Sequence, residues 1–229
     1  MKKYKVILFD VDNTLFDFDK DQYVAYFNAM KECGINCTED MYNDYYQINR
    51  GLWHKLDDGM ISLDSLLVER HRLFFNKYNI DIDAFSFDRL LTLKFRDTGT
   101  LIPGVKEVLD TLYGDYELII VSNSPMEQQY HRLRNADILY YFSKIFLSEE
   151  VGYSKPDIRF FEAVFNSIKN IDKSEILIIG DSISSDILGG INAGIDTCWY
   201  NPKRKVKRLN IEPNYEITDY KELSMILNK

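Results

Sequence analysis

The sequence predicts an α/β fold, in which a parallel β-sheet is flanked by helices and an all-helical segment is inserted after the first strand. Short apolar runs alternate with amphipathic segments over most of the chain, and this alternation is typical of parallel sheets. Residues 18–95 break the alternation, because their apolar side chains recur at helical spacing without a convincing strand. A length of 229 residues allows either one large domain or a core with a smaller insertion.

Apolar runs of β-forming residues are the predicted strands. The first, KVILFD at residues 5–10, is followed by turn residues and fits a strand buried on both faces. The others are ELIIVSN from Glu117, KIFLS from Lys144, EILIIGD from Glu175 and TCWY from Thr197. Amphipathic segments between these runs predict the flanking helices.

The inserted segment is assigned to residues 18–96 as a helical domain, and the core to residues 1–17 and 97–229. Its two connections to the core are expected at residues 14–20 and 96–104. The second contains two glycines and a proline, a composition suited to a hinge.

Composition excludes several classes of protein. The balance of 45% hydrophobic and 28% charged residues is that of a globular chain, and a net charge of -8 disfavours binding to a nucleic-acid polymer. No apolar stretch approaches the roughly 18 residues of a membrane helix, and Asp10 interrupts the first apolar run before it could form a signal-peptide core. We therefore expect a cytoplasmic protein without a membrane partner. Cys33, Cys37 and Cys198 are expected to be reduced thiols, and the basic stretch 203–208 a solvated face.

Residues that can carry chemistry directly follow the predicted strands. In open α/β sheets, ligands bind beyond the carboxyl ends of the strands. Asp10 and Asp12 follow the first strand, and Asp181 follows the fourth, with Asp186 shortly after it. Ser122 and Asn123 end the second strand, and Lys155 lies in a loop after another. These side chains are expected to converge on one edge of the sheet.

Carboxylates crowded at one edge of the sheet repel one another, and a nearby positive charge is needed to offset this repulsion. Two like charges about 4 Å apart repel by roughly 4 kcal/mol even at an effective dielectric near 20, so the aspartates cannot all stay ionised unaided. Mg²⁺ favours sites with few carboxylates, some water and a substrate phosphate. The sequence therefore predicts that Mg²⁺ and a phosphoryl ligand bind together beside Asp10, Asp12, Asp181 and Asp186.

Each of these residues can be assigned a role in phosphoryl transfer. Asp10, held at a strand end, can attack phosphorus to form an aspartyl-phosphate that water then opens. Asp12 lies two residues further on the same side, and is placed to protonate the leaving oxygen and later deprotonate the water. Ser122 can donate to a phosphoryl oxygen, and Lys155 can neutralise transition-state charge. The expected phosphate-binding residues are Asn13, Thr14, Ser122, Asn123 and Lys155.

Four ordered segments carry a resemblance to a known family. They are DVDNT from Asp10, VSNS from Val121, the lysine of GYSKPD at Lys155, and GDSISSD from Gly180. Together they resemble the four motifs of the haloacid-dehalogenase superfamily. The resemblance covers the whole chain, with Asn13 standing where many relatives have glycine.

The resemblance implies a Rossmann-like core and an inserted helical cap of the family's first type, which closes over the substrate. It implies that Mg²⁺ is bound by the Asp10 carboxylate, the Asp12 backbone carbonyl and Asp181. Asp186 would be a further acidic partner of the metal or of Lys155.

Two further stretches, SSDILGGINAGIDTCWYNP from Ser184 and LIPGV from Leu101, resemble the YjjG-like 5′-nucleotidases that act on pyrimidine nucleoside monophosphates. The expected partner is thus a small phosphorylated metabolite. Arg50, Trp53 and His54 are candidates for contacting its base or sugar; the alternative for Trp53 and His54 is packing in the helical core. Other functions that remain open are a sugar-phosphate phosphatase or phosphomutase of the same superfamily, and a non-catalytic phosphate-binding module.

Overall fold

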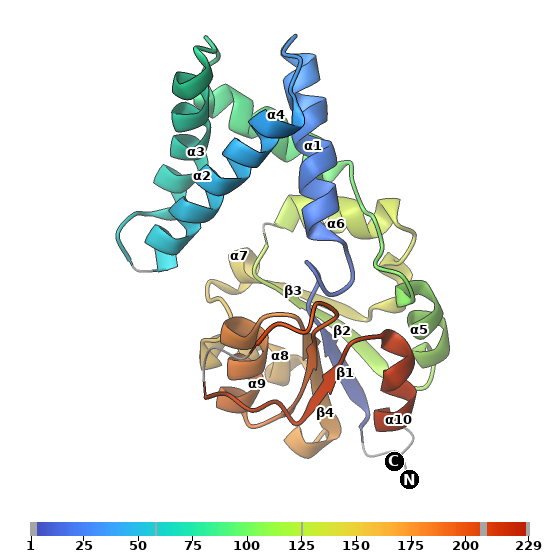
Figure 1. The fold of residues 1–229 in the computed structure, drawn as a ribbon. Coiled ribbons are helices and arrows are strands. Elements are labelled where there is room, and N and C mark those ends of the chain that lie inside the picture. Colours follow the sequence, from blue (N-terminus) through green and yellow to red (C-terminus); the bar gives the residue numbers. More distant parts are fainter. Residues whose placement is uncertain (1–3, 58, 125, 207–209, 228–229) are drawn as a thin grey trace. The chain divides into compact units, whose positions relative to one another are not determined.

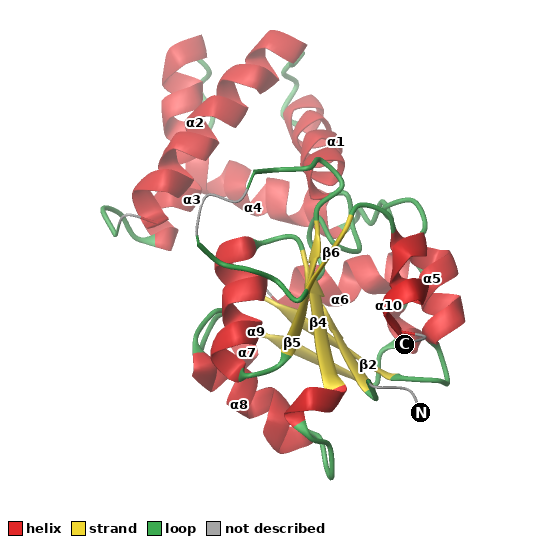
Figure 2. Ribbon diagram, turned by 60° about the horizontal axis from the view of Figure 1, so that its bottom comes forward, coloured by secondary structure: helices red, strands yellow, loops and turns green. Residues whose placement is uncertain are grey.

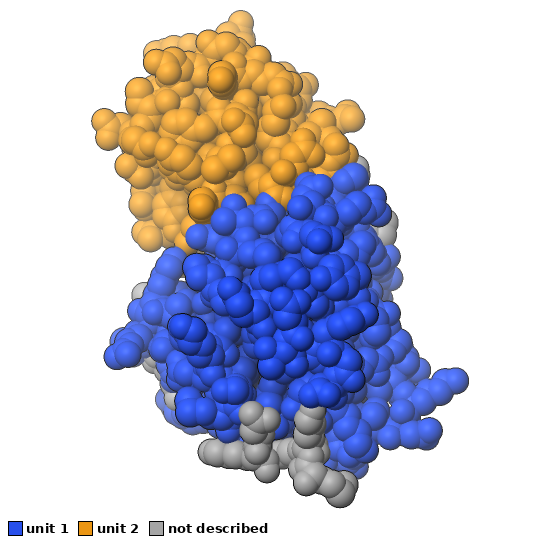
Figure 3. Space-filling model, turned by 90° about the vertical axis from the view of Figure 1, so that its right-hand side faces the viewer, with its two compact units in different colours: residues 1–18, 99–229 blue, residues 19–98 orange. Residues whose placement is uncertain are grey.

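The computed structural model describes residues 4–57, 59–124, 126–206 and 210–227. The chain forms two compact units, coloured separately in Figure 3. The first comprises residues 1–18 and 99–229, and the second comprises residues 19–98. Figure 1 shows that the first unit contains the sheet and that the described part of the second is helical.

The sheet has six parallel strands in the order β3-β2-β1-β4-β5-β6. The predicted parallel α/β sheet is therefore confirmed. The strand β1 lies at the centre, between β2 and β4. The strands are β1 (Val6–Phe9), β2 (Glu117–Ser122), β3 (Lys144–Leu147), β4 (Ile176–Gly180), β5 (Asp196–Tyr200) and β6 (Tyr215–Ile217).

Side chains of the central strands alternate between two apolar layers. In β1, Ile7 and Phe9 belong to one buried cluster, whereas Val6 and Leu8 belong to the other. This alternation is the two-residue period of a strand, and it explains why the run is apolar throughout. Helices therefore cover both faces of the sheet, as Figure 2 shows.

The first layer packs the sheet against α5, α6 and α10, and the second packs it against α8 and α9. The helices of this unit are α5 (Val105–Leu112), α6 (Met126–Asn135), α7 (Ser148–Val151), α8 (Ile158–Ser167), α9 (Leu188–Ala193) and α10 (Leu223–Leu227). Among the described helices, none combines the length and the apolar composition that crossing a membrane requires.

The edge strand β6 is the one strand of the described sheet that the sequence did not predict. It has only three residues, and it pairs with β5 over Cys198 to Tyr200. Asn214, just before it, accepts hydrogen bonds from the backbone and the hydroxyl of Thr197 at 2.9 and 3.0 Å. A strand this short, fixed by a side chain of the preceding loop, has too few residues for a periodic pattern.

The helical unit is built around aromatic side chains. Tyr26 stacks on Tyr45 with ring centroids 4.0 Å apart, and Phe74 and Phe87 meet Tyr26 edge-on. Its helices are α1 (Phe18–Glu32), α2 (Glu39–Asp57), α3 (Leu63–Tyr78) and α4 (Ala84–Arg96). Ser62 caps α3, because its side-chain oxygen accepts a hydrogen bond from the Ser65 amide.

Trp53 and His54 do not belong to this aromatic core. Both lie on exposed positions of α2, and 40% of Trp53 is exposed. The alternative that placed them in helical packing is therefore wrong, because the inward face of α2 is taken by other side chains, among them Tyr42, Tyr45 and Leu52.

A buried polar cluster lies beside the aromatic core. Arg70 donates to Asp88 at 2.7 Å, and His71, which is fully buried, lies 3.1 Å from the same carboxylate oxygen. Burial lowers the pKa of His71 to about 4, although the hydrogen bond to Asp88 opposes this shift. Folding therefore keeps this imidazole neutral.

We predict that His71→Gln removes part of the acid sensitivity of the fold. Between about pH 6.5 and pH 4, the unfolded chain binds a proton on His71 that the folded chain, with its pKa near 4, does not. The wild-type free energy of unfolding should therefore fall as pH decreases through this window. Urea unfolding across that range measures the slope, which should be shallower in His71→Gln.

The matched control is His54→Gln, because His54 is exposed on the neighbouring helix α2. It should keep the wild-type slope. An unchanged slope in His71→Gln would contradict the neutral, buried state of His71.

Candidate active site

A cavity of about 250 Å³ lies at the carboxyl ends of the central strands, within the first unit. Because β1, β2 and β4 are adjacent and parallel, residues that follow them meet at one edge. Most of the sequence-predicted site residues line this cavity. Its lining is Asp10, Asp12, Asn13, Phe18, Ser122, Asn123, Ser124, Lys155, Asp181, Ser182, Ser185 and Asp186.

A buried ammonium group joins two of the aspartates. Lys155 Nζ donates to Asp10 Oδ1 at 2.8 Å and to Asp186 Oδ1 at 2.6 Å. Its third contact is the backbone carbonyl of Val121, at 2.7 Å. Lys155 is only 3% exposed, so all three contacts are made away from bulk water, where ionic interactions are strongest.

Burial and mutual repulsion change the proton affinities of these groups. Burial alone would lower the pKa of Lys155, but the Asp10 and Asp186 carboxylates outweigh it and raise that pKa. Burial, with repulsion from Asp186, raises the pKa of Asp10 to about 7, against the opposing attraction of Lys155. One cation therefore does not compensate all the negative charge in the site.

Asp181 completes an acidic group suited to a hard cation. Carboxylate oxygens of Asp10, Asp181 and Asp186 lie within 4.8 Å of one another. Burial, followed by repulsion from Asp10, raises the pKa of Asp181 to about 6. Oxygen donors of this kind suit Mg²⁺, and a divalent cation would relieve the repulsion that raises these pKa values. The donor set therefore fits the predicted metal.

The backbone after β4 is shaped to hold Asp186. A side chain on Gly180 would place its Cβ 2.3 Å from the Asp186 carboxyl carbon, so only glycine fits at this position. The π-helical turn η3 (Ile183–Ile187) carries Asp186 back toward β4, and the Ser182 amide donates to Asp186 Oδ2 at 3.0 Å. On the neighbouring side, Trp199 Nε1 donates to the Asp181 carbonyl at 2.9 Å.

The loop after β1 turns sharply at Asn13. Asn13 has φ 60°, a left-handed conformation that favours glycine and tolerates asparagine. This conformation explains why asparagine can stand where the resemblance leads one to expect glycine. Asn13 itself lines the cavity.

Thr14 lies elsewhere than expected. It is fully buried and is not among the described residues that line the cavity. Its hydroxyl donates to Asp10 Oδ2 at 3.0 Å, and its carbonyl accepts from the Tyr220 hydroxyl. Thr14 thus holds the Asp10 carboxylate from the core side and does not line the site.

Asp12 is separated from the acidic group. Its Oδ1 lies 2.5 Å from Arg132 Nη1, and its Oδ2 accepts from Ser124 Oγ at 2.6 Å and from Gln129 Nε2 at 2.9 Å. The Asp12 side chain is not part of the carboxylate group formed by Asp10, Asp181 and Asp186, and it is paired instead with a cation of α6, Arg132. The backbone carbonyl of Asp12 remains a predicted ligand.

Ser122 and Asn123 extend the site from β2. Ser122 is buried, and its hydroxyl accepts from the Ser124 amide at 3.2 Å. Both ends of the Asn123 side-chain amide bond the main chain of Lys155, at 2.9 and 3.0 Å. Asn123 therefore fixes the loop that presents the buried lysine.

Arg50, Trp53 and His54 lie in the helical unit, exposed on α2. Their predicted role in substrate recognition stays a prediction.

Gln129, Arg132 and Lys205 were not predicted from the sequence to contact site residues. Gln129 and Arg132 lie in an ordinary amphipathic segment, where an arginine gives no sign of being buried. Lys205 belongs to the basic stretch expected to be a solvated face, yet its Nζ lies 3.1 Å from Asp181 Oδ2. Its position in a loop after β5 hints at the site edge of the sheet, but a lysine in a basic loop is not enough to predict a contact with Asp181.

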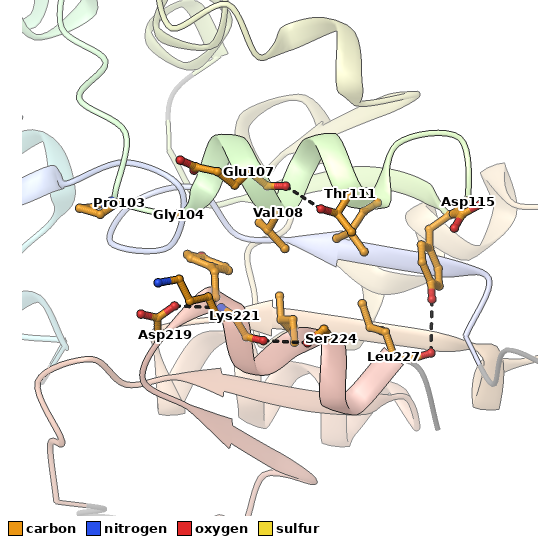
Figure 4. A pocket seen from close by; sticks show the side chains of 14 residues that line it. Pro103, Gly104, Glu107, Val108, Thr111, Asp115, Asp219, Lys221, Ser224 and Leu227 are labelled. Atoms are coloured by element: carbon orange, nitrogen blue, oxygen red, sulfur yellow. Dashed lines mark hydrogen bonds between the residues drawn. The ribbon is translucent and has the colours of Figure 1, made fainter.

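A larger cavity, of about 530 Å³, lies between α5 and the C-terminal helices η4 (Tyr220–Glu222) and α10 (Figure 4). Its polar residues serve local structure: Asp219 caps η4 through the Lys221 amide, and Thr111 bonds the Glu107 carbonyl. Size alone would favour this cavity, but the convergence of charged groups favours the smaller one as the active site.

Comparisons with known proteins find relatives that match nearly the whole chain. A family model described as haloacid dehalogenase-like hydrolase matches residues 7–200. Pyrimidine 5′-nucleotidase PynA from Streptococcus pneumoniae is 35% identical, with 99% of this chain and 96% of PynA covered. Pyrimidine 5′-nucleotidase YjjG from Escherichia coli is 30% identical, with 99% of each chain covered. The crystal structure of the HAD-hydrolase YfnB from Bacillus subtilis, bound to magnesium, is 35% identical, has a TM-score of 0.94 and covers 100% of both chains.

We predict that Lys155→Met strongly destabilises the metal-free protein. The substitution leaves the buried carboxylates of Asp10 and Asp186 facing each other without a cation, and breaking such an arrangement costs about 3–5 kcal/mol. The loss should be smaller at low pH, because the carboxylates can then bind protons. Urea unfolding in the presence of a chelator, near neutral and acidic pH, measures both effects.

Lys205→Met is the matched control. The Lys205 side chain is 54% exposed, so its removal should cost less than about 1 kcal/mol. Equal losses in the two variants would contradict the assignment of Lys155 as the cation that stabilises the site.

Proposed function

The chain belongs to the haloacid dehalogenase-like hydrolase family, and from this premise we propose that it is a Mg²⁺-dependent phosphomonoester hydrolase that uses Asp10 as its nucleophile. The observation that carries the proposal is the arrangement of Asp10, paired with a buried lysine, beside two further carboxylates in one cavity. Such a site offers an oriented nucleophile and oxygen ligands for a cation at the same point.

In the first step, a carboxylate oxygen of Asp10 attacks phosphorus as the bond to the leaving oxygen breaks. Asp12 gives its proton to that leaving oxygen, and an aspartyl-phosphate forms. Lys155 holds Asp10 Oδ1, and Thr14 holds the other carboxylate oxygen. The nucleophile is therefore fixed in orientation before substrate arrives, which lowers the entropy cost of the reaction.

In the second step, Asp12 takes a proton from water as the water attacks the phosphorus of the aspartyl-phosphate. The bond between phosphorus and the Asp10 oxygen breaks, and free phosphate leaves with the Asp10 carboxylate restored. Lining polar groups, such as the Ser122 hydroxyl and the Asn13 and Asn123 main chain, are proposed to bind the phosphoryl oxygens.

Mg²⁺ is proposed to be held by Asp10, the Asp12 backbone carbonyl and Asp181, with Asp186 bound to Lys155. When bound, it supplies positive charge that keeps the carboxylates ionised and offsets the charge of the phosphoryl oxygens.

The proposed substrates are pyrimidine nucleoside 5′-monophosphates in the cytoplasm. This choice is supported by the printed activities of PynA and YjjG, whose chains align with nearly the whole of this one. Residues 18–96 are proposed to form the cap, and residues 1–17 and 97–229 the catalytic core. Exposed side chains on α2, Arg50, Trp53 and His54, are proposed to contact the base or the sugar.

We predict that the protein releases phosphate from pyrimidine monophosphates in the presence of Mg²⁺ and that Asp10→Asn abolishes turnover, with a loss of about 10⁴-fold or more because no covalent step is left. Asp12→Asn should lose about 10²–10⁴-fold through impaired proton transfer and still bind metal. A malachite-green phosphate assay over pyrimidine and purine monophosphates, their deoxy forms and sugar phosphates measures activity and preference together.

Full activity in Asp10→Asn would contradict the nucleophile assignment. Isomerisation of a sugar phosphate without phosphate release would instead indicate a phosphomutase. A preference for sugar phosphates over nucleotides would leave the chemistry intact and change the substrate class.

We predict that Mg²⁺ stabilises the fold through the acidic group. At a free concentration about 100 times the Kd, binding adds about 2.7 kcal/mol to the free energy of unfolding. The gain should be larger near pH 8 than near pH 5, because Asp10 and Asp181, with pKa values of about 7 and 6 in the metal-free protein, are largely protonated at the lower pH.

Thermal unfolding with and without Mg²⁺ measures this gain. Asp181→Asn should reduce it, whereas Asp64→Asn, on an exposed position of α3, should leave it unchanged. A gain that Asp181→Asn does not reduce would contradict the proposed metal site.

A further inference from the structure

Helix α6 carries a buried arginine that faces the proposed proton-transfer residue. Arg132 has no exposed side-chain area, and its Nη1 lies 2.5 Å from Asp12 Oδ1. Its guanidinium group packs over the ring of Phe16, with 4.5 Å between the guanidinium carbon and the ring centroid. A cation this deeply buried is stable only when it is paired, so its partner Asp12 is held in turn.

The second oxygen of the Asp12 carboxylate is held as well. Gln129 Nε2 donates to Oδ2 at 2.9 Å, and Ser124 Oγ donates to the same atom at 2.6 Å. Gln129 is fully buried, and its own carbonyl oxygen accepts from Arg132 Nη1 at 3.3 Å. Both carboxylate oxygens therefore have fixed partners, and two of these partners come from successive turns of α6.

Arg132 and Gln129 contact the described lining of the site through Asp12. Neither is among the described residues that line the cavity, whereas Asp12 and Ser124 both are. A substrate in that cavity would therefore contact Asp12, whereas Arg132 and Gln129 of α6 would affect it through the Asp12 carboxylate.

We infer that Arg132 and Gln129 are positioning residues that orient the Asp12 carboxyl group for proton transfer to the leaving oxygen. The inference rests on the proposed function. As the bond from phosphorus to the leaving oxygen breaks, the Asp12 proton moves to that oxygen, and the carboxylate that remains faces the Arg132 guanidinium group. A misoriented carboxyl group transfers its proton poorly, since proton transfer needs hydrogen-bond geometry.

The choice of leaving group separates this role from a structural one. An alkoxide such as the 5′-oxygen of a nucleoside is a poor leaving group and needs the proton, whereas p-nitrophenolate is a stable anion and leaves without it. Loss of Asp12 orientation should therefore slow a nucleoside monophosphate much more than p-nitrophenyl phosphate. A general loss of folding or of phosphate binding would slow both substrates alike.

The test compares kcat and KM of Arg132→Met and Gln129→Leu on both substrates with Mg²⁺ present. For the nucleoside monophosphate, kcat should fall about 10²-fold in Arg132→Met and about 10-fold in Gln129→Leu, with KM changed less than about threefold. For p-nitrophenyl phosphate, kcat should fall less than about threefold in both variants. Arg132→Lys keeps the charge but not the planar fork, so it should recover part of the loss.

Arg134→Met, which removes an exposed arginine from the same helix, is the matched control and should behave as wild type. Equal losses on both substrates, or no loss on either, would overturn the inference. If Arg132→Met does not fold, Gln129→Leu, which keeps the buried cation, decides by the same ratio.

Failure of the proposed function would give a different result from failure of the positioning role. A wild-type protein that releases phosphate from neither substrate contradicts that proposal and, with it, the role of α6. An active wild type with equal losses in the variants contradicts only the positioning role.

Discussion

The buried ammonium of Lys155 is the interaction on which the site depends. It bonds Asp10 after β1, Asp186 beyond β4 and the Val121 carbonyl of β2, so one charge connects the ends of three adjacent strands. Taking a cation and two carboxylates out of water is costly, and mutual attraction offsets the cost only when the geometry is well fixed. Two features fix that geometry: the hydrogen bonds between the Asn123 side chain and the Lys155 main chain, and the close approach of Asp186 to Gly180.

Two buried cations pair with different carboxylates of the site. Asp10 and Asp186 share Lys155, while Asp12 has the buried Arg132 of α6. The proposed nucleophile and the proposed proton-transfer group therefore have different buried cations as partners, although they line one cavity. Asp181 has the exposed Lys205 as its cationic partner, and a divalent cation bound there would offset charge that no buried cation among the described residues pairs with directly.

The sequence predicted the features that follow from local pattern and sheet topology. Apolar runs located the central strands, and parallel pairing brought Asp10, Ser122 and Asp181 to one edge. Partners set by packing could not be predicted. Arg132 lies 120 residues from Asp12 in the sequence, on a helix with an ordinary amphipathic pattern. Thr14 has the sequence context of a turn residue, but in the structure it is fully buried. The strand β6 is too short to show a period.

The proposed mechanism requires that Asp10 becomes phosphorylated during turnover. It is tested most directly by quenching the working enzyme in acid, with substrate and Mg²⁺ present, and by fragment mass spectrometry of the peptide that contains Asp10 and Asp12. We expect a phosphoryl group on Asp10 that is lost as substrate is exhausted. Steady release of phosphate with no phosphoryl group on Asp10, or with one on another residue, would contradict it.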